Sequence, residues 1–189
     1  NIPTILIDLG KLYAFQGELD LANEAFEKAI KEAEKEKRFL SIVGSKLYKE
    51  KKFDFALKSY LLAKKENSKA QYYIQIANIY SNLGEVESMY KELIELVIQY
   101  PQYFQTCKNI IRRTISDDNL NDNNQNLKKL LIKKIQKNNS QKIYKLLVWL
   151  FIQEKNFNKA LDYEISIDKK VTDNLTDIID LADISLSNN

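Results

Sequence analysis

The feature that most constrains this chain is an internal repeat with a period of 34 residues. The segment Leu19–Ala22 aligns with Phe53–Ala56, which lies 34 residues later. Further copies of the pattern follow at 70–103 and 141–174. A fixed period of this length is typical of folds in which each unit buries its apolar face only by stacking on its neighbours.

Each copy predicts two amphipathic helices joined by a tight turn. In the first copy, apolar residues recur at spacings of three and four along the first helix, as at Leu6, Leu9 and Tyr13. Only four glycines and two prolines occur in 189 residues, so there are few residues that break helices. The composition therefore favours an all-α fold.

The turn between the two helices has its own signature. Gly17 and Gly84 stand where the first helix must end in a left-handed residue, a conformation that glycine adopts without steric cost. Lys51 and Lys155 occupy the same place in two other copies. We therefore expect the same turn in all four copies, at some cost where the residue is lysine.

Small residues recur at one position of each helix, where two helices can approach closely. On the first helix these residues are Gly10, Gly44, Ala77 and Val148, and on the second helix they are Ala22, Ala56, Met89 and Ala160. The pattern predicts that Gly10 faces Ala22 across the first helix crossing.

This 34-residue unit, with its order of small and large residues, resembles the tetratricopeptide repeat (TPR) family. The resemblance implies an all-α, right-handed α-solenoid, a TPR-like superhelix formed by a single array over residues 1–189. The expected repeats are 3–36, 37–69, 70–103 and 141–174, with an irregular repeat between them and the start of a further repeat at 175–189.

The irregular repeat covers residues 104–140. A polar, Asn-rich stretch at 116–126 replaces the short turn and predicts an extended loop, with a second helix from about 127 to 137. Because Asn1 is not a methionine and 175–189 has no partner helix, we expect the chain to be a fragment of a longer array.

The composition excludes much of the chemistry of enzymes. Histidine is absent and Cys107 is the only cysteine, so neither a His-dependent nucleophile nor a zinc site of Cys and His ligands can form. The spacing of Asp117, Asn119 and Asn121 is that of a calcium loop, but Lys128 stands where that loop needs a glutamate. We therefore expect no enzyme activity, no cofactor and no metal site. No apolar run is long enough to span a bilayer.

The resemblance also implies a binding surface. In this family, positions two, five, nine, twelve and thirteen of the first helix line a concave groove. The five basic residues at these positions are Lys11, Arg38, Lys49, Lys142 and Lys145, and none of the positions is acidic. We expect the groove to bind an acidic or extended segment of another protein. The remaining candidate contacts are Phe15, Tyr48, Asn78 and Trp149, and Trp149 either packs between neighbouring helices or anchors the partner.

Family members that bind chaperone C-termini carry a carboxylate clamp of lysine and asparagine. Ile7, Lys11 and Ile42 stand at the clamp positions of the first two repeats, so a chaperone-binding role is not supported. The expected function is a non-catalytic protein-binding scaffold, with no small-molecule substrate.

Three alternatives stay open. The array could be the regulatory or targeting arm of a larger enzyme. An RNA-binding helical repeat is disfavoured by the 34-residue period. The lysine-rich helix at 127–137 could contact nucleic acid or an anionic membrane, although no aromatic residue lies among its lysines. The stretch 146–161 resembles long TPR proteins of AT-rich Gram-negative bacteria, some of which act at the cell envelope. The resemblance therefore implies a bacterial source and favours the periplasmic side of the envelope, with the cytoplasm as the alternative.

Overall fold

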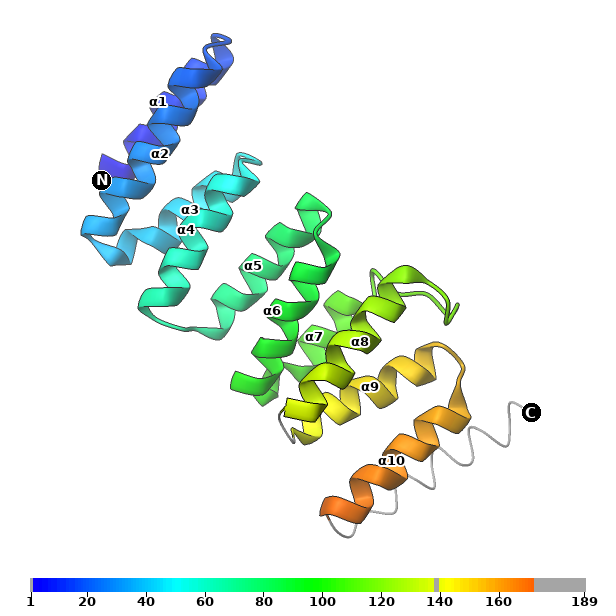
Figure 1. Cartoon of the computed structure of the whole chain (residues 1–189). Helices are drawn as coiled ribbons and strands as arrows, with labels where there is room; N and C mark the ends of the chain where they lie inside the picture. Colours follow the sequence, from blue (N-terminus) through cyan, green and yellow to red (C-terminus); the bar gives the residue numbers. More distant parts are fainter. Residues whose placement is uncertain (1, 138–139, 172–189) are drawn as a thin grey trace. The chain divides into compact units, whose positions relative to one another are not determined.

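The computed structural model describes residues 2–137 and 140–171, and every regular element in these ranges is helical (Figure 1). The α-helices are α1 (Ile2–Phe15), α2 (Leu19–Lys35), α3 (Leu40–Lys49), α4 (Phe53–Glu66), α5 (Ala70–Leu83), α6 (Val86–Gln99), α7 (Phe104–Ile111), α8 (Asp122–Lys137), α9 (Gln141–Gln153) and α10 (Phe157–Val171). Short 3-10 helices, η1 (Lys37–Phe39) and η2 (Pro101–Tyr103), precede α3 and α7. The fold class is an all-α solenoid of helical repeats, as the sequence predicts.

The turns within four hairpins have the same backbone geometry. Gly17, Lys51, Gly84 and Lys155 all have positive φ, at 83°, 57°, 77° and 55°. After each of them, the next backbone N–H bonds to the carbonyl five residues earlier, as Glu18 does to Tyr13 at 2.9 Å. This left-handed turn satisfies carbonyl groups at the end of the first helix. The prediction that Lys51 and Lys155 replace glycine in the same turn is confirmed.

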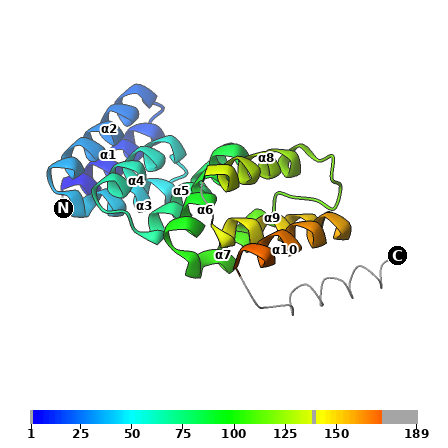
Figure 2. The same cartoon turned by 60° about the horizontal axis from the view of Figure 1, so that its bottom comes forward.

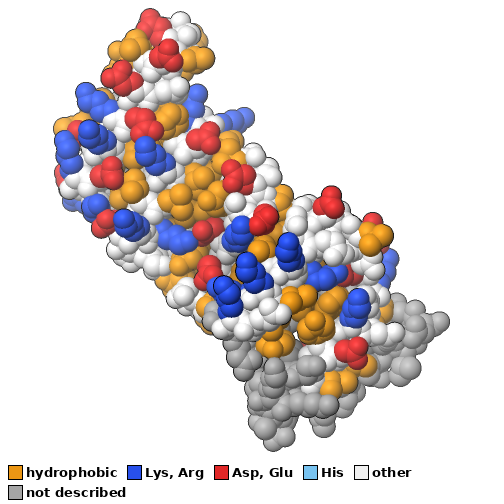
Figure 3. Space-filling model, in the orientation of Figure 1, with side chains coloured by type: hydrophobic (Ala, Val, Ile, Leu, Met, Phe, Trp, Pro, Cys, Tyr) orange, Lys and Arg blue, Asp and Glu red, His pale blue; other side chains and the backbone are white. Residues whose placement is uncertain are grey.

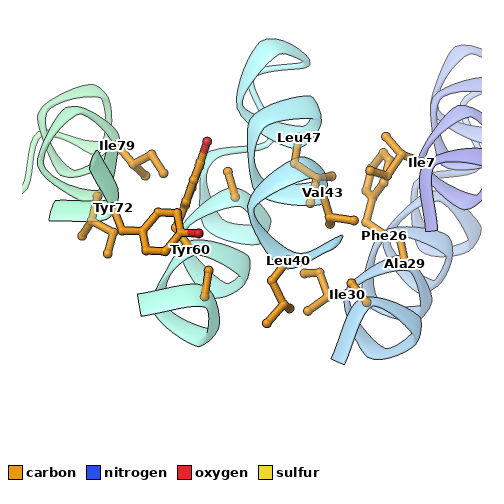
Figure 4. Close-up of a cluster of buried hydrophobic side chains, with 14 of the residues drawn as sticks. Ile7, Phe26, Ala29, Ile30, Leu40, Val43, Leu47, Tyr60, Tyr72 and Ile79 are labelled. Atoms are coloured by element: carbon orange, nitrogen blue, oxygen red, sulfur yellow. The ribbon is translucent and has the colours of Figure 1, made fainter. Parts of the chain in front are cut away.

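The chain forms two compact units, Asn1–Glu92 and Leu93–Asn189. In the first unit, the hairpin of α1 and α2 packs on that of α3 and α4, and α4 packs on α5. Figure 4 shows Ile7 and Phe26 lying together, with Val43 and Leu47 facing them from α3. All four side chains are fully buried, so these hairpins share one apolar core.

Gly10 creates space for an aromatic ring. A methyl group at Gly10 would lie 2.5 Å from Cε1 of Phe26, and one at Gly44 would lie 2.9 Å from Cδ2 of Tyr60. The atoms nearest to this position are therefore those of Phe26, one helical turn beyond the predicted Ala22, because the large ring fills the space that the absent side chain leaves. The rings also link hairpins, since Phe26 lies 5.4 Å from Phe55 between ring centroids.

In the second unit, α8 packs on α9, and α9 packs on α10 (Figure 2). The long connection between α7 and α8 is shorter than the sequence predicts. Helix α8 begins at Asp122, five residues before the expected start at 127, so 122–126 is helical rather than part of a loop. The cause is a helix cap, because Asn121 Oδ1 accepts hydrogen bonds from the backbone N–H groups of Asn123 (3.0 Å) and Asn124 (3.3 Å).

Asn124 organises the remaining connection. This buried side chain accepts a hydrogen bond from the Ser116 N–H at 3.1 Å and donates to the Ser116 carbonyl at 2.9 Å. It also donates to Glu154 Oε1 at 3.1 Å, and the opposite oxygen of Glu154 lies 3.1 Å from Lys128 Nζ. The connection is therefore held to α8 and to the end of α9 by buried polar groups.

The expected repeats 3–36, 37–69, 70–103 and 104–140 each contain one pair of α-helices in the described ranges, and 141–171 contains α9 and α10. The expected further repeat at 175–189 lies outside the described residues.

Candidate partner-binding surfaces

The candidate residues divide between the two units. Lys11, Phe15, Arg38, Tyr48, Lys49 and Asn78 lie in the first unit, and Lys142, Lys145 and Trp149 lie in the second. Each unit therefore presents its own candidate surface, and the two are described in turn.

Acidic residues neutralise part of the basic face of the first unit. Lys11 Nζ lies 2.7 Å from Glu50 Oε1, and this hydrogen bond raises the pKa of the lysine. Lys46 binds Asp8 Oδ2 at 2.7 Å and the Thr4 carbonyl at 3.0 Å. The groove positions do not include Asp8 or Glu50, each of which follows a groove residue in the sequence. These two acidic residues pair with Lys46 and Lys11 only because α1 and α3 pack together.

Arg38 is also paired. Its guanidinium lies in η1, 2.7 Å from Glu36 Oε2 and 4.8 Å from the ring centroid of Phe39. On the face shown in Figure 3, acidic and basic side chains alternate over the first unit, with apolar patches between them. The first unit therefore carries a mixed surface rather than a uniformly basic one.

A hollow of about 530 Å³ lies along α3. Its lining consists of Ser41, Ile42, Ser45, Lys46, Lys49 and Glu50. Three of these residues, Ser41, Ser45 and Lys49, stand at the groove positions that the family resemblance implies. Lys49 is exposed and forms no ion pair within the part of the chain that the structure describes, and Ile42 is 47% exposed beside it. The hollow combines an apolar contact, two hydroxyl groups and a cation without a counterion.

The aromatic candidates of the first unit differ in exposure. Phe15 is 91% exposed at the end of α1. Tyr48 is half-buried against Phe53, at 5.5 Å between ring centroids, and its hydroxyl accepts a hydrogen bond from Asn82 Nδ2 at 3.2 Å. Asn78 is half-buried, and its carbonyl accepts a bond from the same amide at 2.8 Å. Phe15 is thus the ring most available to a partner.

In the second unit, α7 and α9 bring basic and aromatic residues together. Trp149 is only 8% exposed, and Lys108 Nζ lies 5.5 Å from the centroid of its ring. Lys142 Nζ lies 5.3 Å from the ring centroid of Phe104. Lys145 is half-buried on α9 between Lys142 and Trp149 in sequence. Of the two expectations for Trp149, packing between neighbouring helices agrees with its burial.

The groove residues predicted from the sequence include neither Lys108 nor Arg112. Both stand at groove positions, five and nine, of the irregular repeat 104–140. The predicted groove positions come only from the regular repeats and therefore exclude these two residues. The same position numbering, extended over 104–115, would have included both.

The lysine-rich helix α8 has a divided surface. Lys128 pairs with Glu154, whose side chain is fully buried, and Lys134 pairs with Glu95. Lys129 and Lys133 are exposed and, with Gln125, Lys128, Ile132 and Gln136, line a hollow of about 410 Å³. The apolar residues Leu127 and Leu131 are fully buried, so they are not available for insertion into a membrane.

No group of three metal-ligating side chains occurs in the described part of the chain. Cys107 is buried, and burial raises the pKa of its thiol to about 12. Such a thiol stays protonated at neutral pH and is a poor nucleophile. None of the helices within 2–137 and 140–171 combines the length and apolar character that a membrane span needs.

These stacked hairpins define a helical-repeat protein. The family model of the tetratricopeptide repeat matches residues 3–36 and 70–97. The first match covers α1 and α2, and the second covers α5 and most of α6. These two segments of the chain are therefore similar to tetratricopeptide repeats, and the model matches no other part of it.

Among solved structures, the chain is similar to the crystal structure of a tetratricopeptide repeat protein from Parabacteroides merdae ATCC 43184, with 18% sequence identity and a TM-score of 0.42. The match covers 89% of this chain, and the chain spans 66% of that protein's length. No curated protein matches the chain.

Proposed function

We propose that this chain is a non-catalytic scaffold that binds an acidic or extended segment of a partner protein along the first helices of its repeats. Tetratricopeptide repeats generally mediate protein–protein interaction, and such a role needs no reactive group. The observation that carries the proposal is the hollow along α3, where Lys49, Ser45 and Ile42 line one surface. A cation, a hydroxyl and an exposed apolar side chain together suit a peptide that carries carboxylates and an apolar residue.

The apolar and charged residues have different parts in this binding. Apolar groups that lose water on binding contribute most to the lifetime of a complex. Exposed charges mainly raise the association rate, and their effect falls as salt is added. Phe15 and Ile42 are therefore expected to slow dissociation, and Lys49 is expected to speed association.

The test is capture of partners by the full-length protein, followed by kinetics with the captured partner. Ile42→Ala should speed release, and Lys49→Glu should slow association and weaken its dependence on salt. Lys28→Glu, a matched charge reversal at an exposed position of α2, should change neither rate. A partner that binds equally well to the Ile42 and Lys49 variants would contradict the proposal.

The full-length gene would test the alternative of a regulatory arm. A catalytic domain joined to these repeats would make the array part of an enzyme, and the binding surface would then select its substrate or its location.

A further inference from the structure

Two lysines lie over two aromatic rings in the second unit, and an arginine lies one helical turn from one of these lysines. Lys108 Nζ lies 5.5 Å from the ring centroids of both Phe104 and Trp149, and Lys142 Nζ lies 5.3 Å from that of Phe104. Arg112 follows Lys108 by one helical turn, and its backbone N–H bonds to the Lys108 carbonyl at 2.9 Å. We call Lys108, Arg112 and Lys142 the α7–α9 cation cluster.

This cluster has no counterion within the described residues. None of Lys108, Arg112 and Lys142 forms an ion pair there, whereas Lys128, Lys134 and Lys155 of the same unit each pair with a carboxylate. Like charges four residues apart on a helix repel each other. Burial, and then the charge of Arg112, lower the pKa of Lys108.

Burial distinguishes this cluster from ordinary surface lysines. Exposed cations such as Lys129 and Lys133 are surrounded by water and need no partner. Lys108 and Lys142 are half-buried, so water compensates less of their charge. Cation–π contacts with the rings of Phe104 and Trp149 replace only part of the hydration that the two ammonium groups lose. An anion placed beside the cluster would remove the repulsion and would meet groups that are already positioned.

We propose that the α7–α9 cation cluster binds carboxylate groups of an acidic segment in a partner protein. This inference rests on the proposed function and names a binding site for it. Arg112, which is exposed at the end of α7, presents a guanidinium that suits a carboxylate through two parallel hydrogen bonds. Lys108 and Lys142 add two point charges, so the site favours neighbouring carboxylates over a single one.

The rings argue for carboxylates rather than for nucleic acid. Single-stranded nucleic acids stack their bases on open aromatic faces. Here Trp149 is 8% exposed with Lys108 over its ring, and Lys108 and Lys142 both lie over Phe104. The lysines therefore occupy positions that a base would need.

The chain offers a direct signal for this site, because Trp149 is its only tryptophan. The experiment is a titration of the full chain with a hexaglutamate peptide, followed by tryptophan fluorescence. We expect a saturable change in emission that weakens as salt is added. Hexaglutamine serves as the uncharged control and should give no change.

Variants separate the site from general attraction between charges. Lys108→Met keeps most of the aliphatic packing and removes the charge, and it should weaken hexaglutamate binding roughly 10- to 100-fold, as should Arg112→Gln. Lys108→Arg should retain binding. The matched control, Lys129→Met with Lys133→Met, removes two exposed charges of α8 and should leave binding unchanged. Circular dichroism spectra would show that each variant is folded.

Three outcomes of the titration would overturn the inference. The first is an absence of binding, and the second is an equal loss of binding in the α8 control. The third is tighter binding of poly(U) than of hexaglutamate with the same dependence on Lys108, which would assign the cluster to nucleic acid. A captured partner whose binding needs Lys49 but not Lys108 would refute this site and support the proposed scaffold function. Hexaglutamate binding that depends on Lys108, without any captured partner, would support this site and count against the scaffold function.

Discussion

The regular hairpins and the irregular hairpin reverse the chain by different means. In the regular hairpins, one left-handed residue allows the backbone to close its own hydrogen bonds, and the bond from the residue after it measures 2.9 Å in all four turns. Between α7 and α8, side chains make the corresponding bonds. Asn121 caps α8, and Asn124 bonds to both backbone groups of Ser116.

This difference determines how each hairpin tolerates substitution. A backbone turn depends on the conformation of one residue, so lysine can replace glycine there at a modest cost. A turn built by a buried side chain depends on the identity of that side chain, because its partners are left without hydrogen bonds when it is removed. The irregular hairpin should therefore be the more sensitive to single substitutions.

The largest expected effect is at Asn124. Asn124→Ala would remove hydrogen bonds from the Ser116 N–H, the Ser116 carbonyl and the buried carboxylate of Glu154. We expect it to lower the free energy of unfolding by about 3 kcal/mol, measured by urea denaturation. Asn126→Ala, on the exposed face of the same helix, should change it by less than about 0.5 kcal/mol. Equal effects would mean that the connection is held by its backbone alone.

Gly10 gives the next largest effect and tests the packing of a regular hairpin. Gly10→Leu would place side-chain atoms where the ring of Phe26 lies, and Phe26 has no free space because it packs on Phe55. The expected cost is about 1–3 kcal/mol in the free energy of unfolding. Gly10→Leu combined with Phe26→Ala should recover part of it. Without such recovery, the loss would come from a contact other than Phe26.

A smaller gain is expected at the lysine turns. Lys51→Gly removes the steric cost of the left-handed conformation but makes the unfolded chain more flexible, so the net gain should be about 0.5–1 kcal/mol. Lys28→Gly, in the interior of α2 and exposed, should instead lose about 1 kcal/mol. A loss at Lys51 would show that its aliphatic chain contributes packing that outweighs the backbone strain.

The sequence repeat predicted the helices and the left-handed turns because both depend on local residues. Lys51 and Lys155 were assigned to that turn from their alignment with Gly17 and Gly84 alone. The start of α8 was missed because Asn121 is one of several polar residues in an Asn-rich stretch, and its role depends on the backbone that it caps. The role of Asn124 was missed because its acidic partner, Glu154, lies thirty residues away.

The binding surface was less predictable than the fold. Apart from Arg38, which lies in η1, the predicted groove residues lie on the first helices of the repeats, but a list of positions contains no pairing between helices. Glu50 and Asp8 neutralise Lys11 and Lys46 only through packing. Lys108 and Arg112 were absent from the list because the repeat that carries them is irregular, although the structure places Lys108 over Trp149.

The smallest expected effect concerns local opening of the irregular connection. The sequence alone predicts that proteases cut within 116–126, but helix α8 protects 122–126 and the bonds of Asn124 protect Ser116. The remaining exposed residues are 117–120, where Leu120 is 77% exposed. Thermolysin cleaves on the N-terminal side of large apolar residues, so its first cut should be the bond that precedes Leu120.

Leu12 is also exposed, at 53%, but lies inside helix α1, and a helical backbone must unfold locally before a protease can bind it. Mass spectrometry of the first fragments distinguishes the two sites. Asn124→Ala should speed the cut before Leu120 without changing that before Leu12, and equal acceleration at both sites would mean that the connection opens only when the whole chain unfolds.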